Sequence, residues 1–456
     1  MDRSKQLGEG EVLPLLVKFS IPAIIGMMVN ALYNVVDRIF VGHGVGSVGL
    51  AAITISFPLM IIMMAFAMLI GVGANTLISI RLGQKKKEEA EQIIGNAFLL
   101  LVIISIIITV GGLFFMNPLL KLFGASEEVM PYAREFLTII LMGGVFQNIG
   151  FGMNNFIRGE GNPKIAAATM IIGAVVNTIL NPIFIFVLHL GIRGSALATV
   201  ISQAVSAAWV LYYFLGGKSL LKLQRKNLKI VGSVVGSILA IGSAPFAMQL
   251  AASVLSTILN HELVTYGGDI AVAAMGTVNS LAMLILMPIF GINQGAQPII
   301  GFNYGAHNYD RVKKTLNYAI VGATVIVLLG FVVTQLFPRQ LISLFGESDE
   351  ALIDVGARAL RFFLAMLPII GFQIVGANYF QAVGKPKQAM ILSLSRQVLV
   401  LIPALLILPR FFELDGVFLA GPVADFVSSV ITGIWLVWEL KHLNAKHEEM
   451  QVRNAG

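Results

Sequence analysis

Long apolar runs follow one another through this sequence, and they limit the folds open to it more than any other feature. Between Leu13 and Leu440, runs of roughly 20 to 30 residues alternate with short polar connections, and each can cross a hydrocarbon core about 30 Å thick. Because an unpaired backbone amide costs several kcal/mol in lipid, such runs must form helices. Only 12% of the 456 residues are charged, against roughly a quarter in a soluble protein. The sequence predicts an all-α membrane protein.

Twelve transmembrane helices are expected. Their predicted spans are 13–41, 49–80, 93–116, 131–157, 164–188, 195–215, 233–260, 269–301, 316–336, 352–382, 387–408 and 416–440. Alternate connections are basic, for example Lys85 to Lys87 and Lys218 to Lys229, whereas the opposite set carries acids such as Glu347 and Asp349. Basic connections lie in the cytoplasm by the positive-inside rule. We therefore expect a multi-pass protein of the cell membrane, inner or plasma, with both termini cytoplasmic.

Sequence signatures of catalysis and of nucleic-acid binding are missing. The net charge of +7 comes from Lys and Arg in short connections, which membrane topology explains without a nucleic-acid partner. The chain has no cysteine and neither an HExxH nor a GxSxG motif, and GGKS at Gly216 follows Tyr212 where a phosphate loop needs glycine. We expect no enzyme activity, and no cofactor beyond a coupling ion, H⁺ or Na⁺.

The two halves of the sequence repeat one another. With a shift of 222 residues, LFGASEE at Leu122 to Glu128 returns as LFGESDE at Leu344 to Glu350. With a shift of 223, Pro22 returns as Pro245. Each half holds six predicted helices, an even number, so both halves enter the membrane from the same side. This parallel repeat is typical of transporters that bind substrate between two halves.

The repeat gives the predicted domains. They are an N-lobe at 1–215 with the first six helices, a cytoplasmic linker at 216–232, and a C-lobe at 233–456 with the last six. From Gly216 to Lys229 the linker carries two glycines and five basic residues, which favours a solvated segment over a packed one. The predicted fold is therefore two pseudo-symmetric six-helix lobes.

Polar residues within the first helix are candidates for function, because polar groups at membrane depth are expensive. Asn30, Tyr33, Asn34 and Asp37 fall at positions i, i+3, i+4 and i+7, and so share one face. We expect Asp37 to carry the chemistry and the other three to be auxiliary.

Three residues of the fifth and sixth helices are expected at the depth of Asp37. Asn177 and Asn181 are one turn apart on the fifth helix, and Thr199 lies about a turn into the sixth. Oxygen-rich groups at one depth predict a cation or proton site, with Na⁺ as a possible metal. A structural alternative also fits: Asp37 snorkels to the surface beside Arg38, while the asparagines join helices by hydrogen bonds.

The second half does not repeat this group. Asn260 replaces Asp37, and Val400 and Ala404 stand where the asparagines would recur, an asymmetry that favours a dedicated site. The interior charges of the second half are instead Arg396 and Asp425. They are secondary candidates, interpreted either as a structural ion pair or as part of a second substrate or proton pathway.

Five segments together resemble one known family across almost the whole chain. They are ALYNVVDRIFVG at Ala31 to Gly42, RGEGNPK at Arg158 to Lys164, VVNTILNPIFIF at Val175 to Phe186, GAQPIIGFNYGA at Gly295 to Ala306, and SLSRQVLVLIP at Ser393 to Pro403. The chain is similar to the multidrug and toxic compound extrusion (MATE) transporters, nearest the prokaryotic DinF-like and MepA-like members.

The resemblance implies two six-helix lobes around a central cavity and efflux of organic, often cationic, compounds in exchange for Na⁺ or H⁺. A first-helix aspartate of such members matches Asp37, and their polar residues on helices five and six match Asn177 and Thr199. Where members usually carry a second aspartate, this chain has Asn181. The missing carboxylate puts strong Na⁺ binding in doubt and favours proton coupling through Asp37.

Two alternatives and several partners complete the predictions. A lipid-linked oligosaccharide flippase of the same superfamily should line its cavity with several Lys or Arg, but Arg396 is the clear interior cation here. The other alternative is a membrane-embedded enzyme or a receptor. The sequence shows no nucleophile, metal cluster or soluble domain that would support it. We expect small organic substrates, contact with membrane lipids, no nucleic acid and a monomer.

Overall fold

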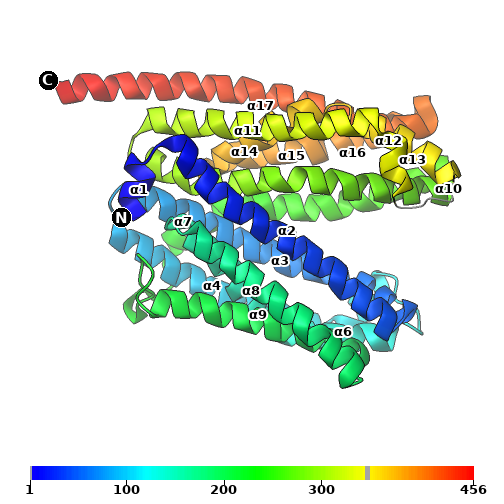
Figure 1. Cartoon of the computed structure of the whole chain (residues 1–456). Helices are drawn as coiled ribbons and strands as arrows, with labels where there is room; N and C mark the ends of the chain where they lie inside the picture. Colours follow the sequence, from blue (N-terminus) through cyan, green and yellow to red (C-terminus); the bar gives the residue numbers. More distant parts are fainter. Residues whose placement is uncertain (1–2, 345–349, 456) are drawn as a thin grey trace. The chain divides into compact units, whose positions relative to one another are not determined.

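Helices make up the architecture (Figure 1). The computed structural model describes residues 3–344 and 350–455, and in these ranges every regular element is a helix. Ten helices within the described residues are long and apolar enough to span a membrane, or twelve spans if each of two bent helix pairs counts as one. The predicted all-α membrane class is confirmed. Residues 345–349, with most of the second LFG motif and the acids Glu347 and Asp349, lie outside the described residues.

The helices of the first half and the linker follow the predicted order. Their bounds are α1 Arg3–Glu9, α2 Val12–Gly44, α3 Ser47–Gly83, α4 Lys87–Phe114, α5 Met116–Leu122, α6 Met130–Met142, α7 Gly144–Gly159, α8 Pro163–Pro182, η1 Ile183–Val187, α9 Gly191–Leu215 and η2 Arg225–Asn227.

The second half contains two very long helices. Its elements are α10 Gly232–Gly305, α11 Tyr309–Leu336, α12 Pro338–Ser343, α13 Glu350–Phe363, α14 Leu367–Ala382, α15 Pro386–Leu394, η3 Ser395–Leu401, α16 Ile402–Ile407 and α17 Pro409–Ala455. A non-helical residue interrupts each of the two, Gly268 in α10 and Glu413 in α17. Gly268 has φ 65° and ψ −165°, a conformation open to glycine, so two expected spans meet there with hardly a loop.

The fourth and tenth expected spans are bent. Helices α6 and α7 meet at an angle of 52°, and so do α13 and α14. At the first bend, a Cβ on Gly143 would lie only 2.4 Å from Cγ2 of Val200. Glycine therefore lets α9 pack closely against the bend.

Two helices change to π geometry within the predicted spans. α8 passes into the π-helix η1 directly after Pro182, and α15 passes into the π-helix η3, which contains Arg396. Proline lacks the N–H that an α-helix needs, so the ladder is already interrupted at Pro182. π segments occur frequently at functional sites, and these two adjoin candidate residues of the two halves.

The chain packs as two units. Unit 1 contains α1 and Ile21–Phe246, and unit 2 contains Gly10–Ser20 and the residues from Ala247 onward. The start of α2 thus belongs with the second half and the start of α10 with the first, so each unit crosses the predicted lobe limits. In unit 2, Arg311 Nη2 donates to the carbonyl oxygen of Gly10 at 2.6 Å.

Part of the linker is packed, contrary to the expectation of a solvated segment. Leu221 is fully buried, and the buried carboxylate of Glu160 accepts hydrogen bonds from Ser219 Oγ at 2.5 Å and Leu221 N at 3.3 Å. Glu91 accepts from the N–H of Lys222 at 3.1 Å. Buried carboxylates of unit 1 therefore fix the linker backbone.

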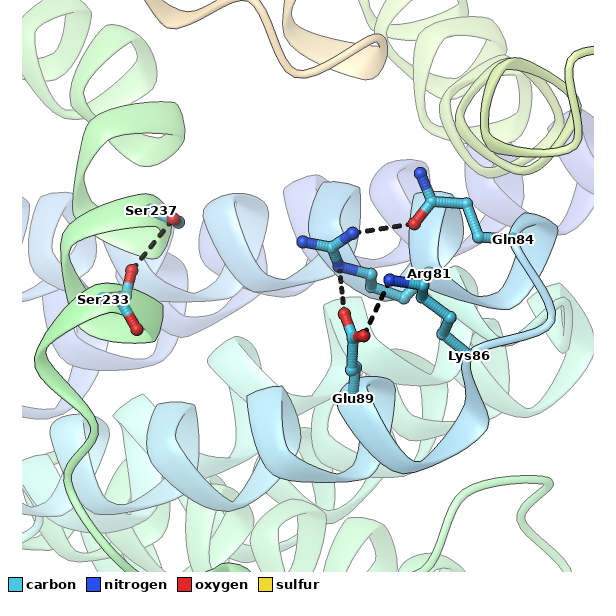
Figure 2. Close-up of polar contacts among 6 residues, drawn as sticks. All are labelled: Arg81, Gln84, Lys86, Glu89, Ser233 and Ser237. Carbon is cyan, nitrogen blue, oxygen red and sulfur yellow. Dashed lines mark hydrogen bonds and ion pairs between the residues drawn. The ribbon is translucent and has the colours of Figure 1, made fainter.

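The basic turn between α3 and α4 is partly neutralised. Figure 2 shows the carboxylate of Glu89 between Arg81 and Lys86, with N–O distances of 3.0 and 2.9 Å, while Arg81 also donates to Gln84. Exposed pairs of this kind contribute at most about 1 kcal/mol. They leave this turn the net positive charge on which the topology prediction depends.

Candidate functional site

Three helices of unit 1 bring Asp37 to the polar residues predicted to join it. Asp37 lies seven residues before the end of α2, is half-buried, and accepts a hydrogen bond from Nδ2 of Asn181 on α8. The same oxygen, Oδ1, accepts from Oγ of Ser195 on α9 at 3.2 Å. Asn181 and Ser195 are fully buried. The carboxylate is therefore held toward the helix bundle, which argues against snorkelling.

A second polar pair lies one turn away on the same two helices. Nδ2 of Asn177 donates to Oγ1 of Thr199 at 3.2 Å, and both side chains are buried. Four residues of helix correspond to about 6 Å, so the two sets of contacts form successive rungs between α8 and α9. This pair also fits the alternative in which amides join helices, and its role in ion binding stays a prediction.

The amide oxygen of Asn181 has no hydrogen-bond partner among residues 3–344 and 350–455. Among the described residues nothing donates to this buried Oδ1, although its Nδ2 is engaged by Asp37. A buried acceptor without a donor is costly, by about 1–3 kcal/mol. The free oxygen beside a carboxylate suits a bound cation or a proton.

The electrostatics of the rung are those of a single carboxylate. Arg38, the next residue, is exposed, and its guanidinium carbon lies 6.0 Å from the ring centroid of Phe57. Across the described residues no group of three or more His, Cys, Asp or Glu could hold a metal ion. A cation at Asp37 would depend on one negative charge and neutral oxygens.

The structure describes only part of the auxiliary group on α2. Asn30 and Tyr33 are half-buried on the helix that carries Asp37, and the side chain of Asn34 lies outside the described part of the chain. Ser195, which contacts Asp37 directly, was missed by the sequence analysis. It lies four residues before Thr199 on the same helix face, and that spacing was the available signal.

The secondary candidates form a separate cluster in unit 2. Nε of Arg396 in η3 donates to Oδ1 of Asp425 on α17, and Asp425 is 2% exposed. The long arginine side chain thus reaches from η3 to α17. Geometry alone leaves both interpretations open, a structural ion pair and a pathway.

Comparison with known proteins places the sequence in a family. The model of the MatE family matches residues 22–183 and 245–406, well over half of the chain, in two copies with the same 223-residue offset as the internal repeat. The predicted pair of related halves is thereby confirmed. The multidrug export protein MepA of Staphylococcus haemolyticus is 28% identical over 95% of both chains, and that of Staphylococcus aureus strain N315 is 27% identical over 91% of both.

Solved structures agree. A multidrug resistance MATE family transporter in an outward-facing conformation superposes with a TM-score of 0.90 at 28% identity, covering 96% of this chain and 98% of that one. A MATE protein in a bent conformation gives 0.92 at 28% identity, covering 98% and 99%. A transporter of the MOP superfamily from Pyrococcus furiosus, described as having a binding pocket of reverse polarity, gives 0.90. The chain belongs to the MatE family of MATE transporters.

Proposed function

We propose that this protein exports small organic, mainly cationic, compounds across the cell membrane in exchange for protons. MATE proteins are membrane transporters rather than enzymes, and the relatives named multidrug export proteins support export of drugs. The chain is a multi-pass membrane protein. Both termini in the cytoplasm, a monomeric state and contact with membrane lipids are parts of the proposal.

The observation that carries the proposal is the position of Asp37. Its carboxylate is half-buried, touches Asn181 and Ser195, and lies beside the Asn177–Thr199 pair, all within unit 1. In the proposed mechanism, ionised Asp37 favours a bound organic cation, and a proton arriving from outside neutralises it and releases the cation. Such exchange requires that proton and drug prefer different access states, because equal affinity would shift nothing.

The donor set supports a proton over Na⁺. Na⁺ is a hard cation that binds best to carboxylate and carbonyl oxygens. The MATE members that this chain resembles usually carry a second carboxylate at the position of Asn181, whose amide has no negative charge. Ser195 and Thr199 supply neutral hydroxyls. One carboxylate suffices to bind and release a proton.

The pairing of Arg396 with Asp425 favours drug export over lipid flipping as the function. A flippase of pyrophosphate lipids needs cationic side chains free to bind the headgroup, whereas Arg396 is paired with the buried Asp425. The ion pair leaves little net positive charge at that place for a phosphate to bind.

The test is transport by purified protein in proteoliposomes with a fluorescent organic cation, driven separately by a pH gradient and a Na⁺ gradient. We expect the pH gradient to drive export, and Asp37→Asn to lower the rate by about tenfold or more, because the titrating charge is lost. Asp354→Asn, which changes an exposed aspartate paired with Arg339, is the matched control and should stay within about twofold of wild type. Undiminished pH-driven export by Asp37→Asn would overturn the mechanism.

A further inference from the structure

A stripe of buried polar residues runs along α17 inside unit 2. Asp425, Ser428, Ser429, Thr432 and Glu439 are each between 0% and 8% exposed, although the helix lies in a predicted membrane span. At 100° per residue these five positions fall within about 60° of their mean direction, so they share one face. From Asp425 to Glu439 the rise is about 21 Å. We call these five residues the α17 stripe.

Ion pairs close both ends of the α17 stripe. At one end Asp425 bonds to Arg396 of η3. At the other, Nζ of Lys385 donates to both carboxylate oxygens of Glu439, at 2.6 and 2.5 Å, and the hydroxyl of Tyr379 lies 3.4 Å from Oε1. Lys385 belongs to a basic connection, the kind predicted to face the cytoplasm. Glu439 also lies four residues before the end of the candidate span Pro409–Leu443, so we expect this end of the stripe near a membrane surface.

Two hydroxyls in the middle of the α17 stripe have no hydrogen-bond partner within the described part of the chain. Oγ of Ser429 and Oγ1 of Thr432 form no hydrogen bond with any described group, although Thr432 is fully buried. Buried hydroxyls are normally satisfied by protein or by internal water. Two unpaired hydroxyls one turn apart on a polar face offer the several polar contacts that a buried water molecule needs.

The opposite wall of the stripe is close and partly apolar. On α14, a Cβ on Gly376 would lie 2.8 Å from Cγ2 of Thr432 and 3.7 Å from Cδ2 of Leu436, the buried residue between Thr432 and Glu439. Helices this close leave no room for an organic cation between them. Anything that passes between them must be as small as a water molecule or a proton.

The Arg396–Asp425 end of the stripe is not repeated in the first half. At the 223-residue offset of the family match, Gly173 stands where Arg396 does, so the first half has no equivalent ion pair. A scaffold element would be expected in both halves. The asymmetry matches that of the Asp37 site, which unit 2 lacks.

From these observations we infer that the α17 stripe conducts protons through water molecules between Glu439 and Asp425, which makes Asp425 a second proton-binding group of the transporter. Protons pass along hydrogen-bonded waters and hydroxyls, with Leu436 as the narrow point. The coupling role of Asp425 rests on the proposed function, whereas access of water to the stripe does not.

The natural absence of cysteine makes the test direct. A single cysteine introduced as Ser429→Cys or Thr432→Cys gives the only S–H infrared band of the protein, and its conversion to S–D after mixing with D₂O reports access of water and protons. Ala424→Cys is the control, since Ala424 is fully buried and lies about 100° off Asp425 on the same helix. The full-length protein in nanodiscs is used throughout.

We expect both stripe cysteines to exchange at least about tenfold faster than Ala424→Cys, which exchanges only through local opening. Adding Gly376→Ala to Ser429→Cys should slow the exchange, because the new methyl group presses against Thr432 and narrows the path. Equal, slow exchange at all three positions would overturn the inference and leave two structural ion pairs.

A transport measurement then separates the stripe from the proposed function. Asp425→Asn should lose pH-driven uphill export several-fold while keeping downhill exchange of labelled for unlabelled organic cation, which needs no proton. Unchanged uphill export by Asp425→Asn would refute its coupling role. If wild type itself moves no organic cation, the proposed function fails, yet the S–D exchange still decides whether the stripe is hydrated.

Discussion

At position 181, an amide stands in place of a carboxylate, and we propose that it sets which ion the unit 1 site prefers. Asn181→Asp places a second carboxylate beside Asp37, and the added anionic oxygen should raise Na⁺ affinity by about tenfold or more, equivalent to 1.4 kcal/mol. We expect a Na⁺ gradient to drive export of the fluorescent cation by this variant. Asn308→Asp, which adds the same charge at an exposed position, should show no Na⁺ response. Absence of Na⁺-driven transport in correctly folded Asn181→Asp would contradict the ascribed role of the missing carboxylate.

Residue spacing predicted several residues of this site but missed the hydroxyl of Ser195, which contacts Asp37. The i, i+4 spacing of Asn177 and Asn181, with the depth of Asp37, placed three polar groups at one level, and the structure joins Asp37 to Asn181. Ser195 escaped notice because serine is common in transmembrane helices and carries no charge to mark it. Which hydroxyl meets a carboxylate is decided by helix rotation, which hydropathy does not encode.

Glu160 determines how the linker element is held. Its carboxylate accepts from Tyr213 and Ser219 hydroxyls and from two backbone N–H groups, and charged hydrogen bonds contribute about 1.5–3 kcal/mol each. Glu160→Gln, which exchanges one strong acceptor oxygen for a donor, should release the linker locally. We expect limited trypsin cleavage after Arg225 and Lys226 to speed up several-fold.

The control for the linker is Glu135→Gln, which breaks the exposed ion pair with Arg193 and should leave the cleavage rate unchanged. A linker equally resistant in Glu160→Gln would mean that Glu91 and Asn96, which accept from Lys222 N and Val231 N, hold it without Glu160. The measurement is gel densitometry of the two fragments over time.

Helix number was predictable and helix shape was not. Hydropathy counts apolar length, so 131–157 and 352–382 were each expected as one span, whereas both are bent by 52°. At Gly143 the missing Cβ lets Val200 of another helix approach the bend, a tertiary contact that hydropathy does not encode. The π segment after Pro182 likewise depends on where the freed backbone groups find partners.

For the whole molecule, the sequence repeat located the two related halves. It did not show that the starts of α2 and α10 each pack in the unit of the other half. Pro22 and Pro245 mark equivalent places, and the family match confirms the offset. Gly10–Ser20 packs in unit 2 and the start of α10 packs in unit 1. Sequence similarity cannot show this, because the apolar pattern of each segment would suit packing in either unit. The close contacts of specific glycines decide it.

From those contacts we predict that the two halves depend on one another for folding. In unit 1 a Cβ on Gly242 would lie 1.7 Å from the carbonyl oxygen of Leu69, and in unit 2 a Cβ on Gly295 would lie 2.6 Å from Oγ of Ser20. A chain cut between Arg225 and Lys226 leaves each fragment without a segment that its unit packs against. We therefore expect each fragment alone to aggregate or to be degraded when produced in cells.

Co-expression of the two fragments should restore a folded complex that co-purifies through a tag on one of them, because every packed segment is again present. A cut between Leu119 and Leu120, inside α5 of unit 1, is the control; it severs a helix and should not be rescued as fully. The measurement is monodisperse elution together with export of the fluorescent cation. A fragment 1–225 that folds alone with the thermal stability of the full chain would show that the start of α10 adds nothing to unit 1. The exchange of helix starts would then be a passive result of chain connection rather than part of what stabilises each unit.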